Sequence, residues 1–174
     1  MATKQILQLG NPMLRENCTP VRSFDPERLE GIVRDLRDTL DDVRRRNGFG
    51  RGIAAPQIGL RERLIFVDVG TPLAMVNPVI IQRSRKKMTL WDDCFSFPDL
   101  MVKVKRNLAI QVRYQDVQGK KHTLDAGGAL SGLLQHEIDH LDGVLAIDRA
   151  IDSRHIAYRR ELEKKEKARD DVPL

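Results

Sequence analysis

The chain has 174 residues, enough for one domain with a sizeable buried core. Apolar residues make up 41% of it and charged residues 32%, which is typical of soluble globular proteins. The first residues lack the apolar run of a secretory signal, and no stretch approaches the roughly 18 apolar residues of a transmembrane helix. We therefore expect a cytoplasmic protein without membrane contact. The net charge of +5 is too small to indicate nucleic-acid binding by itself, and no DNA partner is expected.

Residues 10–24 are rich in turn-forming residues and are expected to be extended along the surface. A helix is predicted to follow, with Asp25 as N-cap and Pro26 in its first position, and to run to about Arg46. Apolar residues recur along it at the three- and four-residue spacing of one buried face. Strand patterns are found next at residues 64–69, 74–82, 86–91, 109–117 and 120–126.

Gln118-Gly119 is predicted to form a two-residue hairpin turn between the last two strands. A helix is predicted at residues 129–141, where Gly143 is placed to end it, and a charged helix at residues 153–169. This order of a helix, several short strands and further helices indicates an α+β fold.

The most informative motif is His136-Glu137-Ile138-Asp139-His140, which lies in the helix predicted at residues 129–141. Helical positions i and i+4 lie one above the other, so His136 and His140 can bind one metal ion from the same face. Glu137 lies beside the first histidine and can handle a proton. Two histidines are too few for catalysis, because such a metal usually has about three protein ligands and an open position for water.

Three sources for the third ligand can be compared. The extended protease motif His-Glu-x-x-His-x-x-Gly-x-x-His fails, because Ala146 occupies the position of its last histidine. Glu161 or Glu163 lies downstream, although its neighbourhood of mixed charges is typical of a solvated helix. Cys94 follows a predicted strand, and thiolate is a strong ligand for zinc and ferrous iron. A lone cysteine is more often a small buried side chain, which is how we interpret Cys18, and both thiols are expected to be free.

Three segments resemble the signature motifs of the peptide deformylase family, in the same order and with similar spacing. Residues 50–57 (GRGIAAPQ) resemble G-x-G-[IL]-A-A-P-Q, and residues 135–140 (QHEIDH) resemble Q-H-E-x-D-H. Residues 92–96 (DDCFS) resemble the second motif, E-G-C-L-S, in a degraded form. The opening segment is also similar, so the resemblance covers roughly residues 5–150.

The resemblance implies an α+β domain in which antiparallel strands surround a central helix that carries His136 and His140. It implies hydrolysis of the N-formyl group of N-formylmethionyl peptides, with release of formate. One catalytic domain would span residues 1–174, with a charged helix and tail at residues 151–174. Cys94 would be the third ligand of one divalent metal ion. Fe²⁺ is favoured because the family most often works with iron, and Zn²⁺ also suits these ligands.

The chemistry can also be argued from the residue types. A divalent metal lowers the pKa of bound water towards about 7. Glu137 can then accept the proton of that water and pass it to the leaving amine. The developing oxyanion needs donors, which the side-chain NH₂ of Gln57 and the backbone N–H of Phe95 can supply.

In the family, the segment matching residues 50–52 lines the cleft and pairs with the substrate like an added strand, so Gly50, Arg51 and Gly52 are the expected substrate-binding residues. Arg51 stands where the family commonly has an aliphatic residue beside the methionine pocket. Ala129 and Gly132 are small where bulkier residues can fill the pocket wall. These differences predict a wider or more polar pocket for the first residue of the substrate.

The second motif departs from the family pattern in three residues: Asp92 replaces glutamate, Asp93 replaces glycine and Phe95 replaces leucine. Aspartate tolerates the positive φ open to glycine better than most residues do, so we expect the turn to survive. Arg106 matches an arginine common after this motif and is expected to pair with Asp92.

The leading interpretation is a metal-dependent deformylase acting on formylated nascent chains or short peptides. A related hydrolase of another formyl or acyl amide is an alternative suggested by Arg51 and Asp93. A non-catalytic formyl-peptide- or ribosome-binding homologue is disfavoured, because binding alone needs no general base. The basic residues from Arg159 to Arg169 could make a weak ribosome contact through RNA phosphates, although a solvated helix is the simpler interpretation.

Overall fold

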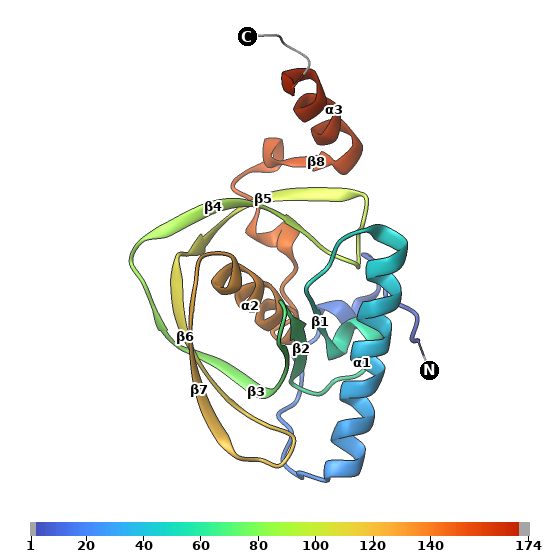
Figure 1. Cartoon of the computed structure of the whole chain (residues 1–174), viewed down its shortest axis with the longest axis vertical. Helices are drawn as coiled ribbons and strands as arrows, with labels where there is room; N and C mark the ends of the chain where they lie inside the picture. The colour runs from blue at the N-terminus through green and yellow to red at the C-terminus, as the bar shows by residue number, and fades with distance from the viewer. Residues whose placement is uncertain (1–2, 171–174) are drawn as a thin grey trace.

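Two antiparallel sheets surround a central helix, α2 (Gly128–Leu141), in the computed structural model, which describes the backbone of residues 3–170 and the side chains of residues 3–164 (Figure 1). The larger sheet contains, in spatial order, β1 (Gly52–Ala54), β2 (Leu64–Asp68), β3 (Pro72–Arg83), β6 (Ala109–Gln115) and β7 (Lys121–Gly127). The smaller sheet contains β4 (Lys87–Asp93), β5 (Leu100–Asn107) and β8 (Ile156–Tyr158). The predicted α+β fold around the histidine-bearing helix is confirmed. None of the described helices is long and apolar enough to cross a membrane.

The helix predicted from residue 25 is α1 (Pro26–Asn47), which packs against β1, β2 and the short helix η2 (Ala55–Ile58). The Asp25 carboxylate accepts hydrogen bonds from the second and third backbone N–H groups of the helix, as expected for an N-cap. Gly48 ends the helix in the left-handed conformation, with φ of 75°. The apolar face is buried except at the partly exposed Val33, and its buried members are Leu29, Ile32, Leu36, Leu40 and Val43.

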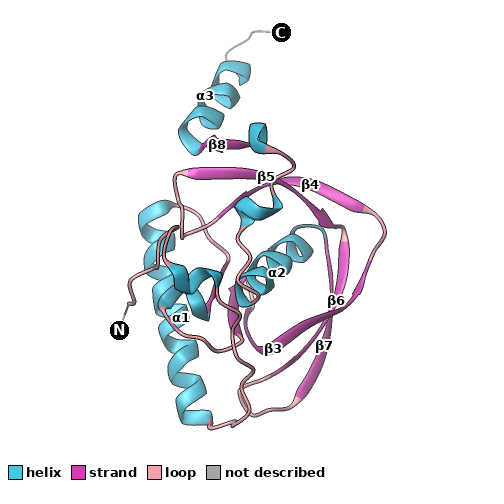
Figure 2. Ribbon diagram, turned by 180° about the vertical axis from the view of Figure 1, so that it is seen from behind, coloured by secondary structure: helices cyan, strands magenta, loops and turns pink. Residues whose placement is uncertain are grey.

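The N-terminal segment runs between α1 and the end of α2, as Figure 2 shows from behind. It contains a short helix, η1 (Pro12–Arg15), and is otherwise mostly extended, as predicted. The Cys18 N–H donates to the Leu141 carbonyl at 2.8 Å, at the end of α2. The chain then turns at Gly143, with φ of 68°, where a Cβ would lie 2.4 Å from the Arg15 carbonyl oxygen. Only glycine fits this turn, which fixes where α2 ends.

Three of the described strands are absent from the sequence prediction: β5, β1 and β8, the last of which falls within a predicted helix. β5 alternates buried valines with lysines, which is a regular half-buried pattern, and it forms the centre of the smaller sheet. β1 has three residues and is fully buried, so it is too short to show a period.

The two-residue hairpin turn is wrong in length, because five residues separate β6 from β7. The Gly119 N–H donates to the Asp116 carbonyl, and the Asp116 N–H donates to the Lys120 carbonyl, each at 3.0 Å. Gly119, with φ of 81°, therefore sits in the left-handed position of a longer turn.

The predicted helix at residues 153–169 is wrong in its first part. A short helix, η4 (Ser153–His155), is followed by β8, and the main helix α3 begins only at Arg159 and ends at Asp170. β8 pairs with the edge of β5, with Leu100 opposite Tyr158. Backbone pairing in the sheet thus overrides local helical preference. The predicted tail beyond residue 170 lies outside the described residues.

Candidate active site

The three predicted metal ligands come together from two elements. Cys94 directly follows β4, and His136 and His140 lie one turn apart on α2. His140 Nε2 lies 3.4 Å from the Cys94 sulfur and 3.2 Å from His136 Nε2. Tetrahedral coordination, with bonds of about 2.0–2.1 Å to nitrogen and 2.3 Å to sulfur, separates such donor atoms by about 3.3–3.6 Å. The three donors are therefore spaced to bind one ion.

A metal ion binds only neutral imidazole, so His140 is ready to ligate whereas a proton must be displaced from His136. All three side chains are buried, and each histidine Nδ1 lacks a regular hydrogen bond. Burial lowers the pKa of His140 well below its usual value, and the nearby charge of His136 lowers it further. Burial also works against protonation of His136, but the Asp92 carboxylate and Cys94 raise its pKa well above the usual value. Two buried imidazoles facing each other beside a thiol form a donor set that a divalent ion would complete.

Asp92 joins the metal helix to the smaller sheet. Its Oδ2 accepts from Arg106 Nε and Nη2 at 3.1 and 2.8 Å, which confirms the expected pair. Its Oδ1 lies 3.0 Å from His136 Nδ1, off the line of a regular hydrogen bond. Arg106 also donates to Asp139 at 2.9 Å, and Asp139 accepts from Arg149. Burial alone would raise the pKa of Asp92, but His136 and Arg106 hold it well below its usual value, so Asp92 remains a carboxylate beside the ligand.

Glu137, the predicted general base, is also buried, with 3% of its surface exposed. Burial raises its pKa to about 7. Its Oε2 has no hydrogen-bond partner among the described residues. Its Oε1 lies so close to Gly52 that a Cβ on that glycine would be 2.7 Å away. The position of the Glu137 carboxyl group thus requires glycine at residue 52.

Gln57 lies on η2 with its amide fixed in one orientation. Its Oε1 accepts from the Ala54 N–H at 2.9 Å. Its Nε2 therefore points to the Cys94 sulfur at 3.5 Å and to the Ser96 hydroxyl at 3.3 Å. Ser96 is a buried residue that the sequence prediction does not include in the site, although it matches the serine of the second motif. The donor end of Gln57 is held beside the Cys94 sulfur.

Phe95 forms one wall of the site. Its ring stacks on Phe49, with centroids 5.5 Å apart. Gly50 has φ of 122°, and a Cβ there would lie 2.0 Å from the tip of the Phe95 ring, so no other residue fits. The backbone N–H of Phe95 has no acceptor within the part of the chain that the structure describes.

Asp93 does not use the positive φ expected for this position, because it ends β4 in extended backbone and Asn77 is the only described non-glycine residue with positive φ. Its carboxylate accepts from Arg159 Nη2 at 3.0 Å. The Arg159 guanidinium also lies 3.9 Å from the centre of the Phe49 ring and donates to the Pro98 carbonyl at 3.1 Å. Arg159 thus balances the charge of Asp93 and ties the start of α3 to two walls of the site.

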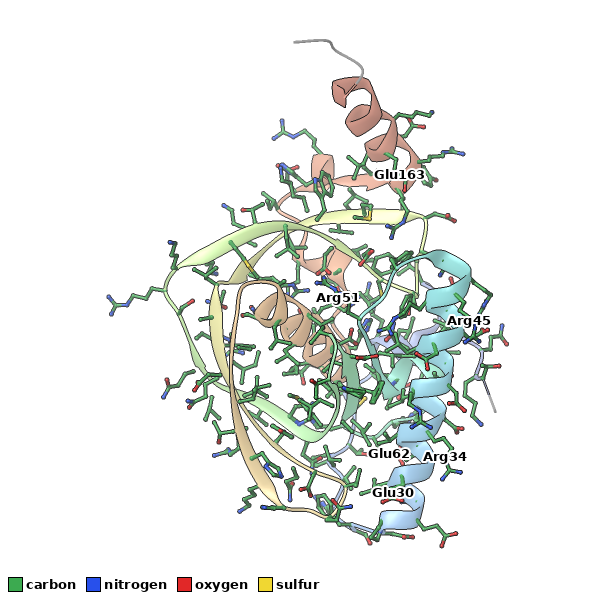
Figure 3. The ribbon with its side chains drawn as sticks, in the orientation of Figure 1. Glu30, Arg34, Arg45, Arg51, Glu62 and Glu163 are labelled. Carbon is green, nitrogen blue, oxygen red and sulfur yellow. The ribbon has the colours of Figure 1, made fainter. Side chains whose placement is uncertain are left out.

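A cavity of about 240 Å³ opens beside these groups. Polar walls come from the segments that carry Glu137, Gln57 and Cys94, while Leu90 and Leu133 add an apolar side. All three predicted substrate-binding residues, Gly50 to Gly52, line it. Figure 3 labels Arg51 between α2 and the end of α1, where its side chain is exposed.

The alternative ligands do not reach this site. Among the described residues, the one group able to hold a metal is Cys94, His136 and His140. Glu161 and Glu163 lie on α3, where Figure 3 labels Glu163. Cys18 is buried elsewhere, and both cysteines are free, as expected.

A model of the polypeptide deformylase family matches residues 3–155. The chain belongs to this family. The peptide deformylase of Desulfitobacterium hafniense is 38% identical over 153 residues, covering 86% of this chain and 96% of the relative. That of Brucella suis is 39% identical over 154 residues, covering 85% of each chain. Family membership and the buried ligand group together make the protein a metallohydrolase of the peptide deformylase type.

Solved structures agree with this assignment. The crystal structure of peptide deformylase from Thermotoga maritima superposes with a TM-score of 0.82 at 34% identity, covering 87% of this chain and all of that one. A Met-Ala-Ser-bound peptide deformylase from Acinetobacter baumannii has a TM-score of 0.78 at 27% identity, covering 85% of this chain and 98% of that one. The family match ends before β8 and α3, so the Arg159 contacts lie outside it.

Proposed function

We propose that the protein removes the N-formyl group from N-formylmethionyl peptides, acting on nascent chains or short peptides and releasing formate. The observation that carries this proposal is the buried Cys94–His136–His140 group with the Glu137 carboxyl beside it in one cavity. A peptide-binding protein without catalysis needs no buried carboxyl group next to a metal-ligand set. The arrangement therefore supports hydrolysis over the non-catalytic alternative.

We propose Fe²⁺ as the resident ion, with Zn²⁺ as a second ion that one thiolate and two imidazoles accept. When bound, a divalent ion would polarise the formyl carbonyl and lower the pKa of water towards about 7. Asp92 would keep the His136 ring in place, because its carboxylate lies 3.0 Å from Nδ1 on the far side of the ring from the ligand nitrogen.

In this proposal Glu137 moves the proton. It accepts a proton from the attacking water and delivers it to the amine nitrogen as the formyl C–N bond breaks, leaving formate and a free amino terminus. A pKa of about 7, caused by burial, suits both halves of this task at neutral pH. Gly52 keeps the carboxyl group in position because its missing side chain leaves the space that Oε1 occupies.

Gln57 and Phe95 would stabilise the oxyanion that forms on the formyl oxygen. The Gln57 NH₂ is fixed by the Ala54 N–H and already points towards the Cys94 sulfur, so it needs no reorganisation. The Phe95 N–H, next to the ligand cysteine, has no acceptor among the described residues and is available as a second donor. Loss of one such donor typically costs about 3 kcal/mol of transition-state stabilisation.

The substrate peptide would pair with the segment Gly50-Arg51-Gly52 and with β1. β1 is the outermost strand of the larger sheet and pairs only with β2 among the described strands, and Gly52 at its start lines the cavity, so an extended peptide in the cavity would pair with its other edge. The Met-Ala-Ser peptide bound to the Acinetobacter relative supports a peptide ligand for the same fold.

A second candidate is a deformylase with an altered first-residue preference, favoured by Arg51 at the cavity. Gly132 does not widen the pocket, because the Met88 methyl group lies 3.1 Å from where its Cβ would be. Ala129 is exposed and does not line the cavity. The expected change is therefore in polarity. For the native protein, the kcat/KM of a formyl-methionyl peptide should exceed that of a formyl-glutamyl peptide by only a small factor. In Arg51→Ile this preference for methionine should be larger, and the same methionine-to-glutamate ratio of kcat/KM in both proteins would contradict this candidate.

We further propose that the protein acts in the cytoplasm and makes a weak ribosome contact through α3. Arg160 and Lys164 are exposed on this helix, while the side chains of residues 165–169 of the predicted basic run are not described. Truncation after Arg160 would keep β8 and the Arg159 contacts. Ribosome co-sedimentation that is unchanged by this truncation would contradict the contact.

The proposed reaction is tested by formate release from formyl-Met-Ala-Ser under anaerobic conditions with added Fe²⁺. The native protein should release formate, and Glu137→Ala should lose about 10²- to 10⁴-fold in kcat while its metal content stays unchanged. Glu163→Ala, on exposed α3, is the matched control and should retain full activity. Full activity of Glu137→Ala would refute the proposal.

A further inference from the structure

A second cavity, of about 230 Å³, lies where β3, β4 and β5 meet α2 and the short helix η3 (Ala146–Arg149). Its walls carry five cationic side chains and one carboxylate: Arg83, Lys87, Lys105, Arg106, Arg149 and Asp139. No residue of the proposed catalytic cavity lines this second one. The excess of positive charge therefore belongs to this second cavity and is not explained by the proposed catalytic site.

Asp139 on the cavity wall and Asp92 behind Arg106 balance only two of these five cations, Arg106 and Arg149. Asp139 Oδ2 accepts from Arg106 at 2.9 Å, and Asp139 Oδ1 accepts from Arg149 at 2.8 Å. Within the described residues, no ion pair involves Arg83, Lys87 or Lys105. Crowding like charges around one hollow is unfavourable, and a bound anion would relieve it.

The connection between β3 and β4, which links the two sheets, extends the positive surface beyond the cavity. Residues 83–87 have the sequence RSRKK, with four cations, no acid, and exposed positions at all but the serine. The arginines at the end of α1 behave differently: Arg44 pairs with Asp68, and Arg45 and Arg46 both pair with Asp42. Single cations without an ion pair occur elsewhere among the described residues, as at Arg34 on α1, but here several of them lie together, on the opposite side of the molecule from α1 (Figure 1).

The floor of the cavity is rigid. Arg106 and Gln135 are 4% and 7% exposed, and hydrogen bonds fix both side chains. Gln135 Oε1 accepts from the Asn107 N–H at 3.0 Å, and its Nε2 donates to the Asn107 carbonyl at 2.9 Å. The exposed cations Arg83, Lys87 and Lys105 surround this fixed polar floor. A hollow of this kind is preorganised for a small polyoxyanion.

We propose that this cavity binds a phosphate group. Phosphate carries several acceptor oxygens and up to two charges, so it can accept charge-assisted hydrogen bonds from guanidinium and ammonium groups on several walls at once. The group is either free phosphate or part of an RNA backbone, which would continue along the exposed connection between β3 and β4 at Arg85 and Lys86. The cavity shares no lining residue with the proposed catalytic cavity, although Arg106 on its floor also holds Asp92. Phosphate held by the exposed cations Arg83, Lys87 and Lys105 should therefore leave formate release unchanged.

The test compares two double variants of the metal-loaded protein by calorimetry. Arg83→Gln with Lys105→Gln removes two unpaired charges from the cavity. Arg34→Gln with Lys120→Gln removes the same charges from α1, where Figure 3 labels Arg34, and from the turn after β6. Each protein is titrated with inorganic phosphate and with a single-stranded oligouridylate of about ten nucleotides. The ionic strength is held at about 0.15 M.

The native protein and the Arg34/Lys120 variant should bind the phosphate-bearing probe with equal Kd. The Arg83/Lys105 variant should bind the probe at least about tenfold more weakly, because it lacks two side chains that donate hydrogen bonds to the charged phosphate. Formate release should be equal in all three proteins. Binding of phosphate identifies free phosphate as the ligand, whereas binding of the oligonucleotide alone identifies RNA. For RNA, the logarithm of the association constant falls linearly with the logarithm of the salt concentration. This negative slope should become shallower by about 0.7 for each phosphate that the variant no longer neutralises. No binding of either probe, or equal weakening in both variants, would overturn the proposal.

Discussion

Replacing Gly52 with alanine would place a methyl group against the Glu137 carboxylate. The new Cβ would lie 2.7 Å from Oε1 and 3.0 Å from Cδ. Restoring ordinary contact at about 3.4 Å requires the carboxylate to move by about 0.7 Å. A misplacement of about 1 Å can cost about 10²-fold in rate, so we expect kcat to fall about 10- to 100-fold. Stability should change by less than about 1 kcal/mol, because only the end of one side chain must move.

The assay is steady-state formate release, with metal content and urea unfolding measured on the same samples. Gly31→Ala is the matched control, since a Cβ on that α1 residue meets nothing within 4 Å. It should leave kcat unchanged and stabilise the helix by about 0.5–1 kcal/mol. Unchanged kcat in Gly52→Ala, or an equal loss in Gly31→Ala, would refute the role assigned to this glycine.

Three further outcomes are expected. Arg106→Met should destabilise the fold by about 3–5 kcal/mol in urea, because it leaves two carboxylates without their buried partner; a loss below about 1 kcal/mol would contradict this network. A double-mutant cycle of Arg159→Ala and Asp93→Gly should give a coupling of about 0.5–1 kcal/mol, and zero coupling would show that the pair contributes nothing. Burial raises the pKa of the Cys18 thiol to about 11. Iodoacetamide at about pH 8 should therefore leave Cys18 unmodified in the folded protein and modify it in urea, and rapid labelling of the folded protein by mass spectrometry would count against this burial.

The metal centre is only partly predictable from local sequence. Helical spacing alone places His136 and His140 on one face, because residues four positions apart lie one above the other on a helix. Cys94 is 42 positions before His136. Periodicity does not predict contacts between residues so far apart in the sequence, so only the resemblance to known motifs identifies Cys94 as a ligand. The contact between Asp92 and His136 depends on how β4 packs against α2, so the sequence predicts only the Asp92–Arg106 pair.

The glycines show a different limit. A G-x-G segment indicates close backbone approach, and the neighbour that the sequence suggests is a substrate. The structure shows that Gly50 and Gly52 are packed against the protein's own Phe95 and Glu137, which only the tertiary fold brings together. The predicted C-terminal helix is too long for a similar reason, since residues 156–158 pair with β5.

The central claim is that one sulfur and two imidazole nitrogens of this chain bind a single divalent ion. X-ray absorption spectroscopy at the zinc edge of the zinc-loaded protein directly measures which atoms coordinate the ion and at what distances. We predict one sulfur at about 2.3 Å and two imidazole nitrogens at about 2.0–2.1 Å, with the sulfur missing from the shell in Cys94→Ser. A shell without sulfur in the native protein, or a sulfur that persists after this substitution, would contradict the account.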